Sequence, residues 1–187
     1  RHKSEDRLLS SYREFPPNQW SLDRVMEWRA SLSPEAPFLS FDGGHALTFG
    51  EALSQALDLA YVLQRSGIHA RDRVATLGGN SSQAVLVWFA INLLGAVDAP
   101  INPAFIGKPL AHAINLVETE IVVVDASLLA SLDAISDELP GVSRILAYGG
   151  NEALPDRSGA RPMLLELVAQ RGVRPATWYV PGAAHSD

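Results

Sequence analysis

Apolar and polar positions alternate between short β-forming runs and longer helical runs across residues 72–125. Residues 73–77 are a β-forming run closed by two glycines, and residues 121–124 are an unbroken β-branched run. Such a β-branched run is typical of a strand that is covered on both faces. Residues 84–94 and a segment opened by Pro109 are predicted helices between the strands. This alternation predicts an α/β fold with a mostly parallel sheet flanked by helices.

The joint before the first of these helices carries three residues that can cap it. Asn80, Ser81 and Ser82 offer side-chain oxygens that can accept the free backbone N–H groups of a first helical turn, and we expect Asn80 to be the cap. Residues 84–94 are apolar on all sides, so we expect a buried helix. Gly95 is expected to end it in the left-handed conformation that glycine adopts readily.

Further elements are predicted around this stretch. Pro100 and Pro103 are expected to mark where pairing of the strand at 97–102 stops, because proline cannot donate to a β-ladder. Before it, we predict a helix from Ser21 that Pro34 ends, a β-hairpin around Gly43-Gly44, and a helix that a capping box of Thr48 and Glu51 begins and Gly67 ends. After Asp125, we predict an amphipathic segment at 128–139, a fourth parallel strand at 143–148, a loop at 149–161 and a short helix at 162–170.

The composition excludes several classes of protein. The 187 residues are 47% apolar and 19% charged, which fits one globular domain. A formal net charge of −6 argues against nucleic acid as a partner, and the lack of cysteine excludes disulfides and thiolate sites. The longest apolar run, around Trp88, is far shorter than the roughly 20 residues that span a bilayer. The charged start lacks the apolar segment of a signal peptide, so we expect no membrane span and a cytoplasmic location.

Few residues form patterns that carry chemistry. The sequence has no Gly-x-Ser-x-Gly elbow, no Walker A loop and no complete Gly-x-Gly-x-x-Gly motif. His112 has Asn115 three residues later, which we interpret as a solvated or locally bonded pair. The five histidines lie in separate predicted elements, without the spacing of metal ligands: His2, His45, His69, His112 and His185.

The best local candidate for a ligand site is the turn at residues 78–82, between a predicted strand and a helix N-terminus. Such a turn can bind an anion through backbone N–H groups at the carboxyl end of a strand. We favour the simpler interpretation, in which the two glycines turn the chain and Asn80 caps the helix. Asp58, Asp72 and Asp98 have no evident partner and are interpreted as surface or joint residues. No catalytic, cofactor-binding or metal-binding residue is assigned.

Motifs spread along most of the chain resemble the N-terminal part of the adenylate-forming superfamily. This superfamily comprises acyl-CoA synthetases, adenylation domains of nonribosomal peptide synthetases and firefly luciferase. Each motif is weak alone, but their order and spacing are specific, and residues 88–90 and 100–102 look closest to acyl-CoA ligases of the carnitine or crotonobetaine type. The motifs are Leu47-Thr48-Phe49-Gly50-Glu51-Ala52-Leu53, Asp72-Arg73-Val74-Ala75, Asn80-Ser81, Trp88-Phe89-Ala90, Leu94-Gly95-Ala96-Val97 and Pro100-Ile101-Asn102-Pro103.

The resemblance implies that a longer protein activates a small carboxylate with ATP and Mg²⁺ and then passes the acyl group to CoA. It divides the chain into an N-terminal arm at 1–19, an α/β subdomain at 20–172 and a connector at 173–187. The connector would lead to a phosphate loop that these residues do not contain. The segment is therefore expected to be inactive alone and to have the remainder of its own chain as a partner.

Two departures from the family pattern leave alternatives open. Arg71 stands where a glycine usually precedes Asp72. Some relatives have an arginine beside the Asn-Pro pair that helps to bind a CoA phosphate, whereas here Ala104 and Phe105 follow and Lys108 is the nearest base. A relative that uses another second nucleophile, such as an ATP-dependent diazotase or a carrier-protein-loading adenylation domain, is one alternative. A non-catalytic scaffold or partner-binding module is another, and the oligomeric state is open.

Overall fold

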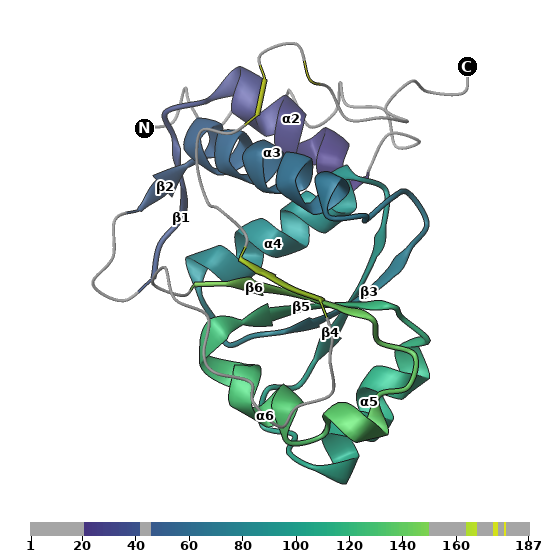
Figure 1. Ribbon diagram of the computed structural model, residues 1–187. Helices are drawn as coiled ribbons and strands as arrows, with labels where there is room; N and C mark the ends of the chain where they lie inside the picture. Colours follow the sequence, from purple (N-terminus) through teal and green to yellow (C-terminus); the bar gives the residue numbers. More distant parts are fainter. Residues whose placement is uncertain (1–20, 42–45, 150–163, 168–173, 176–177, 179–187) are drawn as a thin grey trace.

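The computed structural model describes residues 21–41, 46–149, 164–167, 174–175 and 178, and in them a parallel sheet lies between two layers of helices (Figure 1). The sheet has five strands in the order β4-β3-β5-β6-β7, and all four pairings are parallel. The predicted α/β fold is confirmed. The strands are β3 (Arg73–Leu77), β4 (Val97–Ile101), β5 (Ile121–Asp125), β6 (Arg144–Tyr148) and β7 (Leu164–Leu167).

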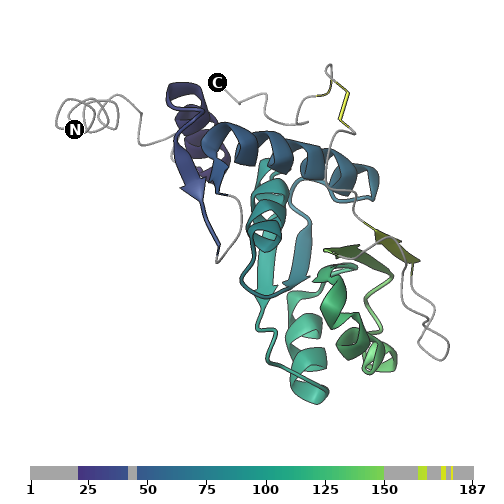
Figure 2. The ribbon, with the colours of Figure 1, turned by 90° about the vertical axis from the view of Figure 1, so that its left-hand side faces the viewer.

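The helices cover both faces of this sheet, as the two perpendicular views show (Figures 1 and 2). One face carries α4 (Ser82–Leu93), with α3 (Phe49–Arg65) and α2 (Leu22–Leu32) packed beyond it. The other face carries α5 (Lys108–Val117) and α6 (Leu129–Asp133). The chain enters the sheet at β3, forms β4 on one side and then crosses to form β5 on the other. This reversal is the topological switch point at which open α/β sheets leave a crevice beyond the carboxyl ends of their strands.

Alternate residues of the strands build two separate cores. Val74, Val123 and Leu146 are fully buried on the α4 side, together with the apolar face of α3. The side toward α5 and α6 is closed by fully or almost fully buried strand residues: Ala75, Leu77, Val122, Val124, Ile145 and Ala147. Because strand side chains alternate between faces, the apolar run at β5 supplies both cores.

The capping box that begins α3 is confirmed. The backbone N–H of Glu51 donates to Thr48 Oγ1 at 3.2 Å, and the backbone N–H of Thr48 donates to Glu51 Oε2 at 2.9 Å. Gly67 follows the helix with a φ of +97°, which favours glycine. Before α3, β1 (Pro37–Leu39) pairs antiparallel with β2 (Leu47–Thr48), as the predicted hairpin requires. The turn at Gly43-Gly44 lies outside the described residues.

The predicted helix at 162–170 is wrong. Leu164–Leu167 is β7, which pairs parallel with β6 from Arg144 to Ala147. A short apolar run fits a strand as well as a helix, and here the open edge of β6 offers backbone hydrogen bonds that decide between them. The predicted fourth parallel strand at 143–148 is confirmed as β6.

The amphipathic segment predicted at 128–139 is broken into three short pieces. It consists of the 3₁₀ turn Ala126–Leu128, α6 (Leu129–Asp133) and the 3₁₀ turn Ser136–Glu138. The apolar pattern is still used, because Leu129, Leu132, Ile135 and Leu139 are buried against the sheet. Helical spacing therefore identified the buried face and overestimated the continuity of the helix.

Pro100 does not end the pairing of β4. It lies inside the strand, opposite Thr76, and Ile101 still pairs with Leu77. β4 is an edge strand with one neighbour, so the missing N–H of a proline costs no ladder hydrogen bond there.

Two expectations for α4 also need correction. The cap is Ser81, whose Oγ accepts the backbone N–H of Ala84 at 3.1 Å, and not Asn80. The helix is mostly buried, but Trp88 is 42% exposed. Gly95 follows the helix with a φ of +69°, as predicted.

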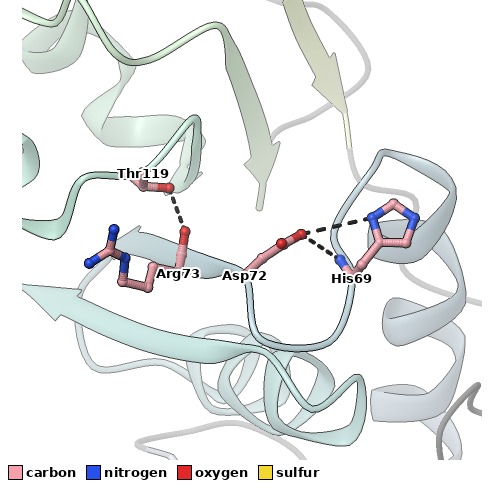
Figure 3. Close-up of polar contacts among 4 residues, drawn as sticks. All are labelled: His69, Asp72, Arg73 and Thr119. Carbon is pink, nitrogen blue, oxygen red and sulfur yellow. Dashed lines mark hydrogen bonds and ion pairs between the residues drawn. The ribbon is translucent and has the colours of Figure 1, made fainter.

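At the amino-terminal ends of the strands, side chains form hydrogen bonds with backbone groups (Figure 3). The backbone N–H of His69 donates to Asp72 Oδ2 at 2.7 Å, so Asp72 is not without a partner. Thr119, which is 5% exposed, donates from Oγ1 to the Arg73 carbonyl at 2.6 Å and accepts the N–H of Ile121 at 3.0 Å. Arg71 adopts a φ of +73° at the position where the family pattern has glycine.

The described residues beyond β7 contact α3. Arg174 Nε donates to Asp58 Oδ1 at 3.2 Å, so the interpretation of Asp58 as unpartnered is also wrong. Trp178 Nε1 donates to Gln64 Oε1 at 2.9 Å, and its ring meets Tyr61 edge-on at 5.5 Å between centroids. Part of the predicted connector thus lies along α3. Among the helices of the described residues, none has the length and apolar character to cross a membrane.

Candidate functional site

A pocket of about 590 Å³ opens at the carboxyl end of β3, between the sheet and the first two turns of α4. Its position matches the switch point of the sheet, where ligands bind in open α/β folds. Most of its wall is apolar, and the polar groups gather on the strand side. The lining residues are Phe41, Thr76, Gly78, Gly79, Asn80, Ser81, Ala84, Val85, Val87, Trp88, Asp98, Pro100, Ile101 and Tyr148.

The register of the strands brings the polar residues of the pocket together. Asp98 pairs with Val74, whose side chain belongs to the core on the α4 side, and Pro100 pairs with Thr76. Residues paired in a ladder share a face of the sheet. Thr76 and Asp98 therefore project on the α4 side from neighbouring strands, where Trp88 faces the same space from the helix.

Asp98 is held by its neighbour on β3. Thr76 Oγ1 donates to Asp98 Oδ1 at 2.7 Å, so the interpretation of Asp98 as unpartnered is wrong. Burial raises the pKa of the Asp98 carboxyl above its usual value, and the hydrogen bond from Thr76 partly opposes this. In the part of the chain that the structure describes, Oδ2 of Asp98 makes no hydrogen bond. The carboxylate thus keeps one acceptor on the pocket.

Tyr148 ends β6 and reaches across to the turn after β3. The residue is only 3% exposed, and its hydroxyl lies so close to Gly78 that a Cβ there would collide with it. Among the described residues, this hydroxyl has no hydrogen-bond partner. Burial, and then the negative charges of Asp125 and Asp98, raise the pKa of Tyr148 to about 12. The phenol therefore stays neutral over the whole physiological range.

The turn at residues 78–82 lies at the carboxyl end of β3, where the sequence placed it. It lines the pocket, and Ser81 caps α4. The resemblance to adenylate-forming enzymes implies ATP, whose phosphates carry several negative charges. Among the described residues that line the pocket, Asp98 is the one charged side chain, and none is a lysine or arginine. These residues do not fit a triphosphate, and a role of the turn in anion binding stays a prediction.

The other sequence candidates lie away from this pocket. His112 is exposed on α5, and Asn115 donates from Nδ2 to the Glu138 carbonyl at 2.8 Å instead of bonding to the histidine. His69 lies at the opposite end of the sheet, and His2, His45 and His185 lie outside the described residues. Within the described ranges, no group of three or more potential ligands could hold a metal ion. Tyr148, Thr76 and Trp88 are not evident as site residues in the sequence, because only the strand register and the packing of α4 on the sheet bring them together.

The comparison with protein families matches one family model, described as AMP-binding enzyme, over residues 26–170. The match runs from α2 to just beyond β7 and includes every described residue that lines the pocket. This confirms the resemblance to adenylate-forming enzymes that the motifs indicate.

Individual relatives agree with the family match. A long-chain-fatty-acid–CoA ligase of Thermus thermophilus is 33% identical over 102 residues, which are 54% of this chain and 19% of that protein. Long-chain fatty acid transport protein 6 of Mus musculus is 29% identical over 144 residues, which are 76% of this chain and 23% of that protein. The crystal structure of an anthranilate CoA ligase with anthranoyl-AMP shares the fold, with a TM-score of 0.66 at 22% identity over 83% of this chain and 30% of that one.

The chain thus spans about a fifth of the length of these curated relatives. The family match covers well over half of the chain and coincides with the described α/β layers. The chain therefore belongs to the AMP-binding enzyme family.

Proposed function

We propose that this chain forms the amino-terminal subdomain of an AMP-forming ligase, which activates a small carboxylate with ATP and transfers the acyl group to CoA. The observation that carries the proposal is the family match over residues 26–170, which spans the sheet and both of its helical layers. In this proposal the doubly wound sheet is the framework against which the rest of the enzyme is placed. The catalytic groups belong to parts of the protein beyond this chain.

The residues that line the pocket support the proposal that the catalytic groups lie outside this chain. A site that transfers an adenylyl group must stabilise the charge of three phosphates, for which proteins use lysine, arginine, metal ions and backbone N–H groups. As far as the structure describes its lining, the pocket offers the acid Asp98 and no basic side chain. We therefore expect residues 1–187 alone to release no pyrophosphate. ATP and Mg²⁺ would be bound by other parts of the complete enzyme.

CoA is the proposed acceptor because long-chain-fatty-acid–CoA ligases are among the relatives. The loop between β4 and α5 is exposed, and Lys108 is its nearest base, at the first residue of α5. A transfer to another nucleophile stays the alternative, since this loop lacks the arginine of some CoA ligases. The identity of the acceptor can be tested separately from carboxylate activation.

The test measures pyrophosphate release by the complete protein with ATP, Mg²⁺ and a panel of fatty and aromatic carboxylates, with and without CoA. We expect release with at least one carboxylate and thioester formation when CoA is present. Residues 1–187, purified in parallel, serve as the comparison. Failure of the complete protein with the whole panel would contradict the proposed activity, and release that scales with the amount of the segment would contradict its inactivity alone.

A further inference from the structure

We propose that the pocket between α4 and the sheet binds a protonated amine carried on an apolar or aromatic body. This ligand is distinct from the ATP and the carboxylate of the proposed ligase reaction. The inference does not depend on that reaction, because it uses only groups that line the pocket of this chain. It begins with two polar groups that the described structure leaves without partners.

The first of these groups is the hydroxyl of Tyr148. Its side chain is almost completely buried, yet in the described residues no donor or acceptor meets the hydroxyl. Among the described residues, the fully buried side-chain atom that lacks a partner is Arg29 Nη1, so we interpret the Tyr148 hydroxyl as a group open to the pocket. The hydroxyl lines the pocket, and a ligand there can form the missing hydrogen bond.

The second group is the free oxygen of Asp98. Thr76 occupies Oδ1, and Oδ2 has no partner within the described part of the chain. Asp98 is the one charged side chain in the described part of the lining, and Asp125 lies close enough to add its negative charge to the field at Tyr148. The strand side of the pocket is therefore negative. A carboxylate or phosphate is repelled there, whereas an ammonium can donate to both Asp98 and the Tyr148 oxygen.

The α4 side of the pocket indicates the chemistry of the ligand's apolar body. Trp88 is 42% exposed although α4 is mostly buried, and Ala84 and Val85 of the same helix continue the apolar surface. An indole face attracts both an aromatic ring and a cation. A volume of about 590 Å³ is within the range of small-molecule sites. The pocket thus fits a primary amine on an aromatic or aliphatic body.

The experiment compares three probes with the same ring and different charges, each titrated into the complete protein by calorimetry at pH 7.5. The probes are tryptamine, a cation, tryptophol, which is neutral, and indole-3-acetate, an anion. We expect tryptamine to bind at least about tenfold more tightly than indole-3-acetate, with tryptophol between them. Anion binding that equals or exceeds amine binding would overturn the proposal, as would no binding of tryptamine at millimolar concentration.

Variants connect the binding to the named residues. Asp98→Asn is expected to weaken tryptamine about tenfold and tryptophol much less, because it removes the charge and keeps the size. Asp137→Asn makes the same change at an exposed acid on the α6 side and is expected to leave all three affinities unchanged. An equal effect of both variants, or none of Asp98→Asn, would contradict the assignment.

A further variant covers the case in which Asp98→Asn does not fold, which circular dichroism of the purified variant would show. Trp88→Ala removes an exposed side chain and should leave the fold intact. We expect it to weaken tryptamine and tryptophol by similar factors of about ten, because both lose the aromatic wall. Unchanged affinity of both probes in a folded Trp88→Ala protein would exclude this pocket as their site.

Discussion

The two ends of the parallel sheet differ in whether their polar side chains have hydrogen-bond partners. At the amino-terminal end, Thr119 and Asp72 bind backbone groups of neighbouring segments (Figure 3), and the Arg73 side chain pairs with Glu118. At the carboxyl-terminal end, Tyr148 and one oxygen of Asp98 face a pocket without a partner among the described residues. Both ends carry threonine and aspartate, so residue type does not explain the contrast.

The contrast shows how one sheet separates stability from recognition. Hydrogen bonds at the amino end join the starts of β3, β5 and β6, and the groups that form them are occupied. At the other end, Tyr148 and one oxygen of Asp98 line the pocket, where a ligand or another part of the protein can reach them. Three predictions test this difference, beginning with the largest expected effect.

The first prediction makes the same substitution at both ends. Thr119→Val should lower the free energy of unfolding by about 2 to 3 kcal/mol, because the Ile121 N–H and the Arg73 carbonyl lose a buried partner. Thr76→Val should cost less than about 1 kcal/mol, because Asp98 remains open to water through the pocket. Urea unfolding of the two variants measures both values. Equal losses of unfolding free energy would contradict the proposed difference between the two ends of the sheet.

The second prediction concerns the glycines after β3. Gly78→Ala places a Cβ against the Tyr148 hydroxyl and should cost about 1 to 2 kcal/mol through overpacking. Gly79→Ala is the matched control, since a Cβ there meets nothing within 4 Å, and it should be neutral or slightly stabilising. In a Tyr148→Phe background the cost of Gly78→Ala should shrink, because the colliding oxygen is gone. A cost that is the same in both backgrounds would place the hydroxyl elsewhere.

The third prediction uses the titration of Tyr148. The folded pKa of about 12 lies above the unfolded value of 10.0, so the native state holds its proton more strongly. Stability is therefore fully present below pH 10 and falls as the pH rises toward 12. At pH 11 we expect Tyr148→Phe to be about 1 kcal/mol more stable relative to wild type than it is at pH 7. Thermal melts at both pH values test this, and a difference that does not change with pH would contradict the assigned environment.

Local signals in the sequence predicted most of the elements correctly. The capping box at Thr48 and Glu51, the glycine after α4 and the β-branched run of β5 each depend on neighbours a few residues away, so their structural consequences can be inferred without the fold. The motif order also indicated the family, which the match over residues 26–170 confirms. The expectation that the segment is inactive alone stays a prediction.

The errors arose where a distant segment decided the outcome. Residues 164–167 form a strand because the edge of β6 was available for pairing, and Pro100 is tolerated because β4 has only one neighbour. The partners of Asp58 and Asp98 lie far along the chain or on an adjacent strand, at Arg174 and Thr76. A pattern within a short stretch of sequence contains no information about contacts with distant residues.

The sequence by itself determined most of the elements, the α/β class and the family of this protein, because periodicity, caps and motifs are properties of contiguous residues. Only the tertiary structure decided where its candidate ligand pocket lies. The pairing of β3 with β4 and the placement of β6 two strands from β3 bring Thr76, Asp98 and Tyr148 around one space. Strand order and register depend on the burial of the whole sheet, and that burial is settled only when all of its layers pack together.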